Sequence, residues 1–81
     1  MNDVNQLLKK TLSETKKLRE GENFLVRDLF ISYEWNRIAR GDRLLLGSMF
    51  FSYVSANPKY GVKAIEKGVS GQQRYQKTSL D

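Results

Sequence analysis

The segment from Asp42 to Ala56 constrains the fold more than any other part of this sequence. On a helical wheel, apolar side chains cover most of its circumference: Leu44, Leu46, Met49, Phe50, Phe51, Tyr53 and Val54. Only Ser48, Ser52 and Ser55 form a polar wedge. A helix that is apolar almost all round is buried or forms a subunit contact. We therefore expect the central helix of the fold at roughly residues 42–56, opened by Gly41–Asp42 and ended by Asn57–Pro58.

The N-terminal segment, residues 2–19, has the pattern of an amphipathic helix. Its apolar stripe contains Val4, Leu7, Leu8, Thr11, Leu12, Thr15 and Leu18, and Lys9, Lys10, Lys16 and Lys17 lie away from the stripe. Asn2 or Asp3 can cap its start, and Gly21 suits a left-handed stop. We expect this helix to pack on the core. The alternative, a helix on a membrane surface, is disfavoured because threonines interrupt the stripe and aromatic residues are absent.

Shorter elements are expected on either side of the central helix. Glu22–Val26 predicts a short extended segment, followed by two short helices: Asp28 favours the start of the first, and Ser32 can cap the second. After the central helix, Val62–Lys67 and Gln72–Thr78 predict a β-hairpin around the Gly68–Gly71 turn, with Tyr75 facing inward. The last three residues, 79–81, are expected to be frayed.

This order of elements predicts an α+β fold in a single domain, residues 1–81. Its parts are an N-terminal helix at 2–19, a helical core at 22–57 and a hairpin at 62–78. Helix, short strand, two short helices, longer helix and hairpin is the order of a winged helix-turn-helix domain. The hairpin would be the wing, and it would pair with the strand around Phe24.

The amino-acid composition limits the classes of function that this chain can have. The chain of 81 residues contains no cysteine and no histidine, so disulfides, thiolate metal sites and the commonest general base are missing. We find no nucleophile–base pair or phosphate loop, and expect neither an enzyme nor a cofactor, metal or small-molecule substrate. The N-terminus lacks a signal-peptide pattern, and the run Leu44–Val54 is too short for a bilayer, so we expect a cytoplasmic protein.

The basic residues supply the functional hypothesis. A formal net charge of +5 favours polyanionic partners. Two basic clusters are candidates for nucleic-acid contacts: Arg37, Arg40 and Arg43 near the start of the central helix, and Lys63, Lys67, Arg74 and Lys77 on the hairpin. If both clusters face one duplex, they can contact phosphates without recognising sequence.

Two alternatives to this hypothesis remain open. The central helix offers serines and Leu45 where a recognition helix usually offers arginine, lysine or amides, so this helix can instead serve a homodimer or another protein partner. The arginines can pair with Glu34 and Asp42, and the hairpin lysines can protect an edge strand from aggregation.

Several other residues have structural interpretations. Trp35 is expected to anchor the helices, and to stack on bases only if it is exposed. Tyr60 and Tyr75 are expected to pack in the hairpin, and Asp28 and Asp42 to act as caps or first-turn acids. Gly47 is expected to allow close approach of another backbone segment.

Four segments resemble a known family: Glu22–Phe30, Glu34–Asn36, Arg43–Gly47 with Phe50, and Gln73–Lys77. They are similar to the small domain-of-unknown-function 1413 proteins of Gram-positive bacteria and their mobile elements. The resemblance covers most of residues 20–78 and excludes the first helix. It implies a compact winged-helix-like domain with no established biochemical role, and it supplies no catalytic or binding residues.

Overall fold

In the computed structural model, which describes residues 3–69 and 71–78, helices and strands follow the predicted order. The elements are α1 (Val4–Thr15), β1 (Asn23–Phe24), η1 (Val26–Leu29), α2 (Ser32–Arg37), α3 (Arg40–Ala56), η2 (Pro58–Tyr60), β2 (Val62–Lys67) and β3 (Gln73–Lys77). The α+β class and the C-terminal hairpin are therefore confirmed. The predicted cap at Asn2 and the predicted fraying of 79–81 fall outside the described residues.

Helix α1 packs its apolar stripe against the core, as predicted. The Asp3 carboxylate caps it by accepting from the Asn5 amide at 2.9 Å. The helix ends at Thr15, earlier than the expected residue 19, and Gly21 adopts the left-handed conformation beyond it. The hydroxyl of Tyr60 donates to the Leu12 carbonyl, one of the acceptors left open at this end. A residue 48 positions away thus contributes to the end of α1.

In each of the two short helices, an acidic side chain of the first turn accepts a hydrogen bond from the backbone amide of the residue just before the helix. In η1, a single 3₁₀ turn, the Asp28 carboxylate accepts from the Leu25 amide at 2.9 Å. In α2, the Glu34 carboxylate accepts from the Ile31 amide at 3.2 Å. Ser32 is therefore the first residue of α2 and not its cap, which is Ile31. These carboxylates satisfy backbone donors that a helix start leaves open.

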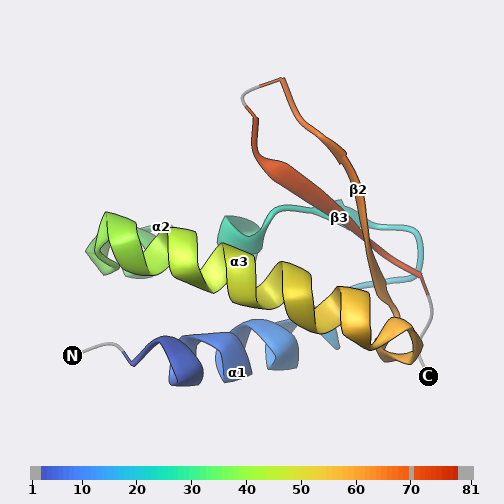
Figure 1. Ribbon diagram of the computed structural model, residues 1–81, viewed down its shortest axis with the longest axis horizontal. Coiled ribbons are helices and arrows are strands. Elements are labelled where there is room, and N and C mark those ends of the chain that lie inside the picture. The colour runs from blue at the N-terminus through green and yellow to red at the C-terminus, as the bar shows by residue number, and fades with distance from the viewer. Residues whose placement is uncertain (1–2, 70, 79–81) are drawn as a thin grey trace.

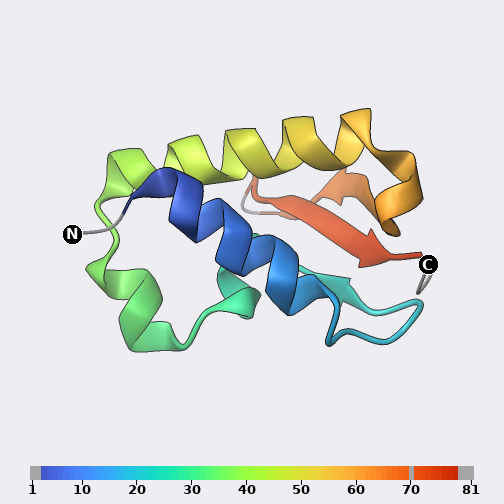
Figure 2. The ribbon, with the colours of Figure 1, turned by 90° about the horizontal axis from the view of Figure 1, so that it is seen from below.

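Helix α3 is the longest element and crosses the middle of the molecule (Figure 1). It starts at Arg40, two residues before the expected position, and ends before Asn57–Pro58 as predicted. Helix α1 lies along one side of it, and the hairpin rises on the other (Figures 1 and 2). No helix in the described part of the chain is long and apolar enough to cross a membrane.

The sheet is antiparallel with strand order β1-β3-β2, so the hairpin pairs with the strand at Phe24 as expected. Tyr75, opposite Phe24, is 1% exposed and confirms the inward orientation predicted for it. Its ring stacks on Phe24 at 5.7 Å and meets the edge of Phe50 at 4.8 Å between centroids. Such aromatic contacts stabilise a core beyond simple area burial. This trio joins the sheet to α3.

One side of α3 is buried in this core. Leu46 and Phe50 are 0% exposed and Val54 is 3% exposed. Their spacing of four residues places them on one stripe of the helix. The remaining core residues are Phe24, Val26, Leu29, Phe30, Ile38, Val62 and Tyr75.

Candidate functional site

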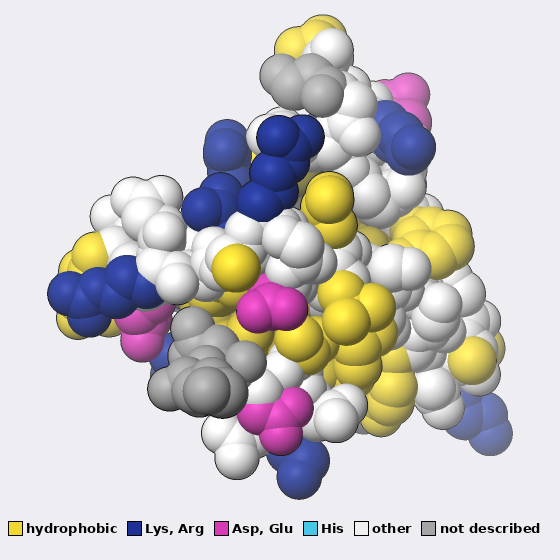
Figure 3. Space-filling view, turned by 60° about the vertical axis from the view of Figure 1, so that its left-hand side comes forward, with side chains coloured by type: hydrophobic (Ala, Val, Ile, Leu, Met, Phe, Trp, Pro, Cys, Tyr) yellow, Lys and Arg dark blue, Asp and Glu magenta, His cyan; other side chains and the backbone are white. Residues whose placement is uncertain are grey.

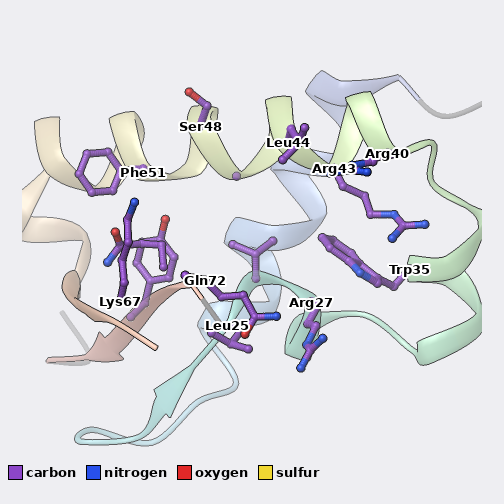
Figure 4. A pocket seen from close by; sticks show the side chains of 15 residues that line it. Leu25, Arg27, Trp35, Arg40, Arg43, Leu44, Ser48, Phe51, Lys67 and Gln72 are labelled. Carbon is purple, nitrogen blue, oxygen red and sulfur yellow. The ribbon is translucent and has the colours of Figure 1, made fainter. Parts of the chain in front are cut away.

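A groove of about 910 Å³ separates α3 from η1 and the hairpin (Figure 4). It is lined by four cationic side chains, Arg27, Arg40, Arg43 and Lys67. Apolar and aromatic residues make up much of the remaining wall: Leu25, Val26, Trp35, Leu44, Phe51 and Tyr75. Gly47, Ser48, Gly71, Gln72 and Gln73 complete the lining. Much of the wall of the groove is thus apolar, and four of its lining residues carry a positive charge.

Two of the predicted arginines reach the groove from the first turn of α3. Arg40 is exposed at the first position of the helix. Arg43 is half-buried, because its Nε donates to the Ile38 carbonyl at 2.8 Å and its guanidinium carbon lies 5.7 Å from the centre of the Trp35 ring. These two contacts hold the Arg43 guanidinium beside Trp35 (Figure 4). Arg43 is therefore a structural residue as well as a candidate ligand contact.

A β-bulge brings Lys67 to the same groove. Ala64 pairs with Tyr75 and Lys67 pairs with Gln73, so three steps on β2 match two on β3. Without this extra residue, the alternation of a strand would place Lys67 on the face of Lys63, away from Tyr75. The Gln73 amide donates to the Ile65 carbonyl within the bulge. The hairpin and helix clusters predicted from sequence thus meet at Lys67.

Arg27 is a groove residue that sequence reasoning missed. It lies in η1, is exposed, and lies across the groove from α3 (Figure 4). No carboxylate occurs among the described residues that line the groove. Four cations from three elements therefore share one open space without a lining residue that would neutralise them.

The other predicted contacts lie elsewhere. Arg37, at the end of α2, places its guanidinium carbon 4.9 Å from the Tyr33 ring centre. Lys63 pairs with Gln76, on the side of β3 opposite Tyr75, and Arg74 alternates with Tyr75 onto that same outer face. Lys77 is 4% exposed because it shares the inward face with Tyr75. Little of its side chain is accessible to a ligand, and the two-residue period from Tyr75 was the signal that could have indicated this.

The arginines near α3 do not form the ion pairs considered as an alternative. Among the described residues, neither Glu34 nor Asp42 makes a salt bridge with Arg37, Arg40 or Arg43. Glu34 instead pairs with Lys10 at 3.2 Å. The hydrogen bond from the Ile31 amide, and then the one from Lys10, lower the pKa of Glu34.

The apolar part of the groove corrects two interpretations. Gly47 was expected to let another segment approach, but a methyl group added there would have nothing within 4 Å. The missing side chain instead leaves space in the groove. Tyr60 packs on Tyr53 of α3, with ring centres 5.5 Å apart, and bonds to α1, so it does not pack within the hairpin.

Two of the groove aromatics, Trp35 and Tyr75, are held by packing. Trp35 is half-buried and lies against Phe30, with ring centres 5.6 Å apart, so its anchoring role is confirmed. Burial raises the pKa of Tyr75 to about 12. A space-filling view shows lysine and arginine side chains close together below the hairpin tip, with apolar side chains beside them (Figure 3).

The model of the family described as domain of unknown function (DUF1413) matches residues 9–77. The chain belongs to this family. The match starts inside α1, so the expectation that the first helix lies outside the DUF1413 resemblance was wrong. It ends at the last residue of β3 and includes every groove residue. No curated protein and no solved structure gives a match to the chain.

Proposed function

We propose that the protein is a nucleic-acid-binding module that holds the sugar-phosphate backbone of a duplex in the groove between α3 and the hairpin. The observation that carries this proposal is the convergence of Arg27, Arg40, Arg43 and Lys67 on one groove with no carboxylate among its described lining residues. Phosphates are the ligands that such a set of cations favours in a nucleic-acid complex. The net charge of +5 adds long-range attraction to a polyanion.

The topology supports the same proposal. The order of helix, strand, two short helices, longer helix and hairpin, with sheet order β1-β3-β2, resembles that of a winged helix-turn-helix module. Such modules place one helix in the major groove and use neighbouring elements to contact the backbone. In this arrangement α3 enters the major groove, and the backbone strand beside it runs between α3 and the hairpin. Arg37, Lys63 and Arg74, outside the groove, contribute only to the surrounding field.

The experiment is a fluorescence titration of a labelled 20-base-pair duplex over a range of salt concentrations. Each phosphate neutralised contributes about −0.9 to the slope of log K against log salt, so four contacts predict a slope of about −3.6. Arg40→Gln and Lys67→Gln should each lower the affinity and reduce the slope by about one. Arg43 is a poorer test position because its side chain also holds the Ile38 carbonyl.

Lys9→Gln is the matched control. Lys9 is exposed on α1, on the opposite side of α3 from the hairpin, and its removal changes the net charge by the same amount. It should leave the slope close to that of the unmodified protein. The absence of affinity for any duplex at low salt would overturn the proposal, as would an equal loss of slope in the Lys9 variant.

A second candidate is a protein-interaction or self-association module. It is favoured by the exposure of three large apolar residues on α3: Leu44 at 67%, Leu45 at 49% and Phe51 at 43%. Sedimentation equilibrium distinguishes the two. A dimer that Leu45→Glu dissociates, in a protein with no duplex affinity, would support this second function and exclude the first.

A further inference from the structure

The outward face of α3 consists of Leu44, Leu45, Ser48, Phe51, Ser52 and Ser55, all of them exposed. Leu44 and Phe51 lie at its edge nearest the groove, and both are lining residues of it. Between Leu44 and Ala56 the helix contains no arginine, lysine, asparagine or glutamine. This face therefore cannot form the bidentate hydrogen bonds that usually distinguish bases.

An apolar face bordered by cations is complementary to one kind of duplex surface. The major groove of B-form DNA is about 12 Å wide and admits a helix, and its apolar group is the C5 methyl of thymine. Leucine and phenylalanine side chains can pack on that methyl, and serine hydroxyls can accept or donate beside it. The positive charge of Arg40, Arg43 and Lys67 along the groove edge matches the flanking phosphates.

We infer that the outward face of α3 contacts thymine methyl groups, so that the ligand class is thymine-containing B-form DNA and not RNA. This inference rests on the proposed function and adds the chemical basis of ligand choice. Double-stranded RNA lacks the methyl group, and its deep, narrow major groove does not admit side chains. The preference would be for composition more than for a defined sequence, since methyl contacts involve no directed hydrogen bonds.

The test compares two duplexes of one sequence, with either thymine or uracil in the deoxy strands. Replacement of dT by dU removes only the C5 methyl and keeps the phosphate charges. The thymine duplex should bind more tightly by about fourfold for each methyl contacted, the ratio expected for burial of one carbon group. The salt slope should be the same for both, because the phosphate contacts are unchanged.

Variants assign the effect to α3. Leu44→Ala and Phe51→Ala should bind the thymine and uracil duplexes with nearly equal affinity. Ile31→Ala is the matched control: Ile31 is 57% exposed, precedes α2 and does not line the groove. It should preserve the discrimination of the unmodified protein.

The outcomes separate the inference from the function on which it rests. No affinity for any duplex would overturn both. Equal affinity for the thymine and uracil duplexes, or equal affinity for an RNA duplex of the same sequence, would overturn the inference and leave phosphate binding in place. Discrimination that persists in both α3 variants would also overturn it, because another part of the protein would then contact the methyl groups.

Discussion

The inner and outer sides of α3 both carry large apolar residues, but these residues lie in different environments. Phe50 is 0% exposed, enclosed by Phe24 and Tyr75, whereas its neighbour Phe51 is 43% exposed and lines the groove. Leu46 and Leu45 differ in the same way, at 0% and 49% exposed. A helix that is apolar almost all round thus leaves part of its apolar surface exposed after folding. Leu44, Leu45 and Phe51 are the large apolar residues of α3 that the fold leaves exposed.

The difference arises from the elements that cover each side. The aromatic cluster of the sheet covers the Phe50 side, and α1 packs beside it. On the Phe51 side, the β-bulge and η1 hold cations at the groove without closing it. The cationic side chains of the groove lie beside the exposed apolar residues of α3. This border of positive charge distinguishes the exposed apolar face from a core surface that merely lacks a covering element.

The largest effect expected from this comparison is on stability. Phe50→Ala should lower the free energy of unfolding by about 3–5 kcal/mol, because it leaves a cavity among packed aromatic rings. Phe51→Ala should cost about 1 kcal/mol or less, since the ring is partly in solvent. Urea unfolding followed by circular dichroism measures both. If Phe50→Ala fails to fold, Phe50→Leu provides the milder comparison, and equal costs at the two positions would contradict the assignment of sides.

A smaller effect of opposite sign is expected at Gly47. Alanine is favoured over glycine inside a helix by about 0.5–1 kcal/mol, and an added methyl at Gly47 meets no atom within 4 Å. Gly47→Ala should therefore raise the free energy of unfolding while it reduces the space in the groove and weakens duplex binding. Gly41→Ala is the control, because a methyl there also meets nothing and Gly41 does not line the groove. Loss of stability in Gly47→Ala would show that this side of α3 is closed.

Local signals in the sequence predicted the elements well. The polar wedge of α3, the stop at Asn57–Pro58 and the inward orientation of Tyr75 each follow from residues close together in the chain. The end of α1 was placed too late: its last residue is Thr15, and the hydroxyl of Tyr60, far away in sequence, donates to the Leu12 carbonyl in its last turn. Periodicity carries no information about such a contact.

The groove was predictable only in part, for a similar reason. The positions of Arg40 and Arg43 could be predicted from the position of the start of α3. Lys67 faces the groove only because of a β-bulge, which no pattern of residues in the sequence predicts. Arg27 belongs to the site because the fold places η1 opposite α3. Lys77, in contrast, could have been excluded from its spacing to Tyr75.

The smallest expected effect concerns Glu34, whose carboxylate closes the start of α2 next to Trp35 at the groove edge. Its pKa in the folded protein is below the ordinary value of 4.5, first because the Ile31 amide donates to it and second because of Lys10. The resulting stabilisation is fully present above pH 4.5 and is lost as the pH falls through the lower, folded-state pKa.

Glu34→Gln should therefore make the free energy of unfolding less dependent on pH in this acidic range. An NMR titration of the Glu34 carboxyl should give a pKa below 4.5, and Lys10→Gln should preserve part of that depression because the hydrogen bond from the Ile31 amide remains. A Glu34 carboxyl with a pKa at or above 4.5 would mean that the hydrogen bond from the Ile31 amide does not stabilise its charged form. The start of α2, next to Trp35, would then be held without this bond.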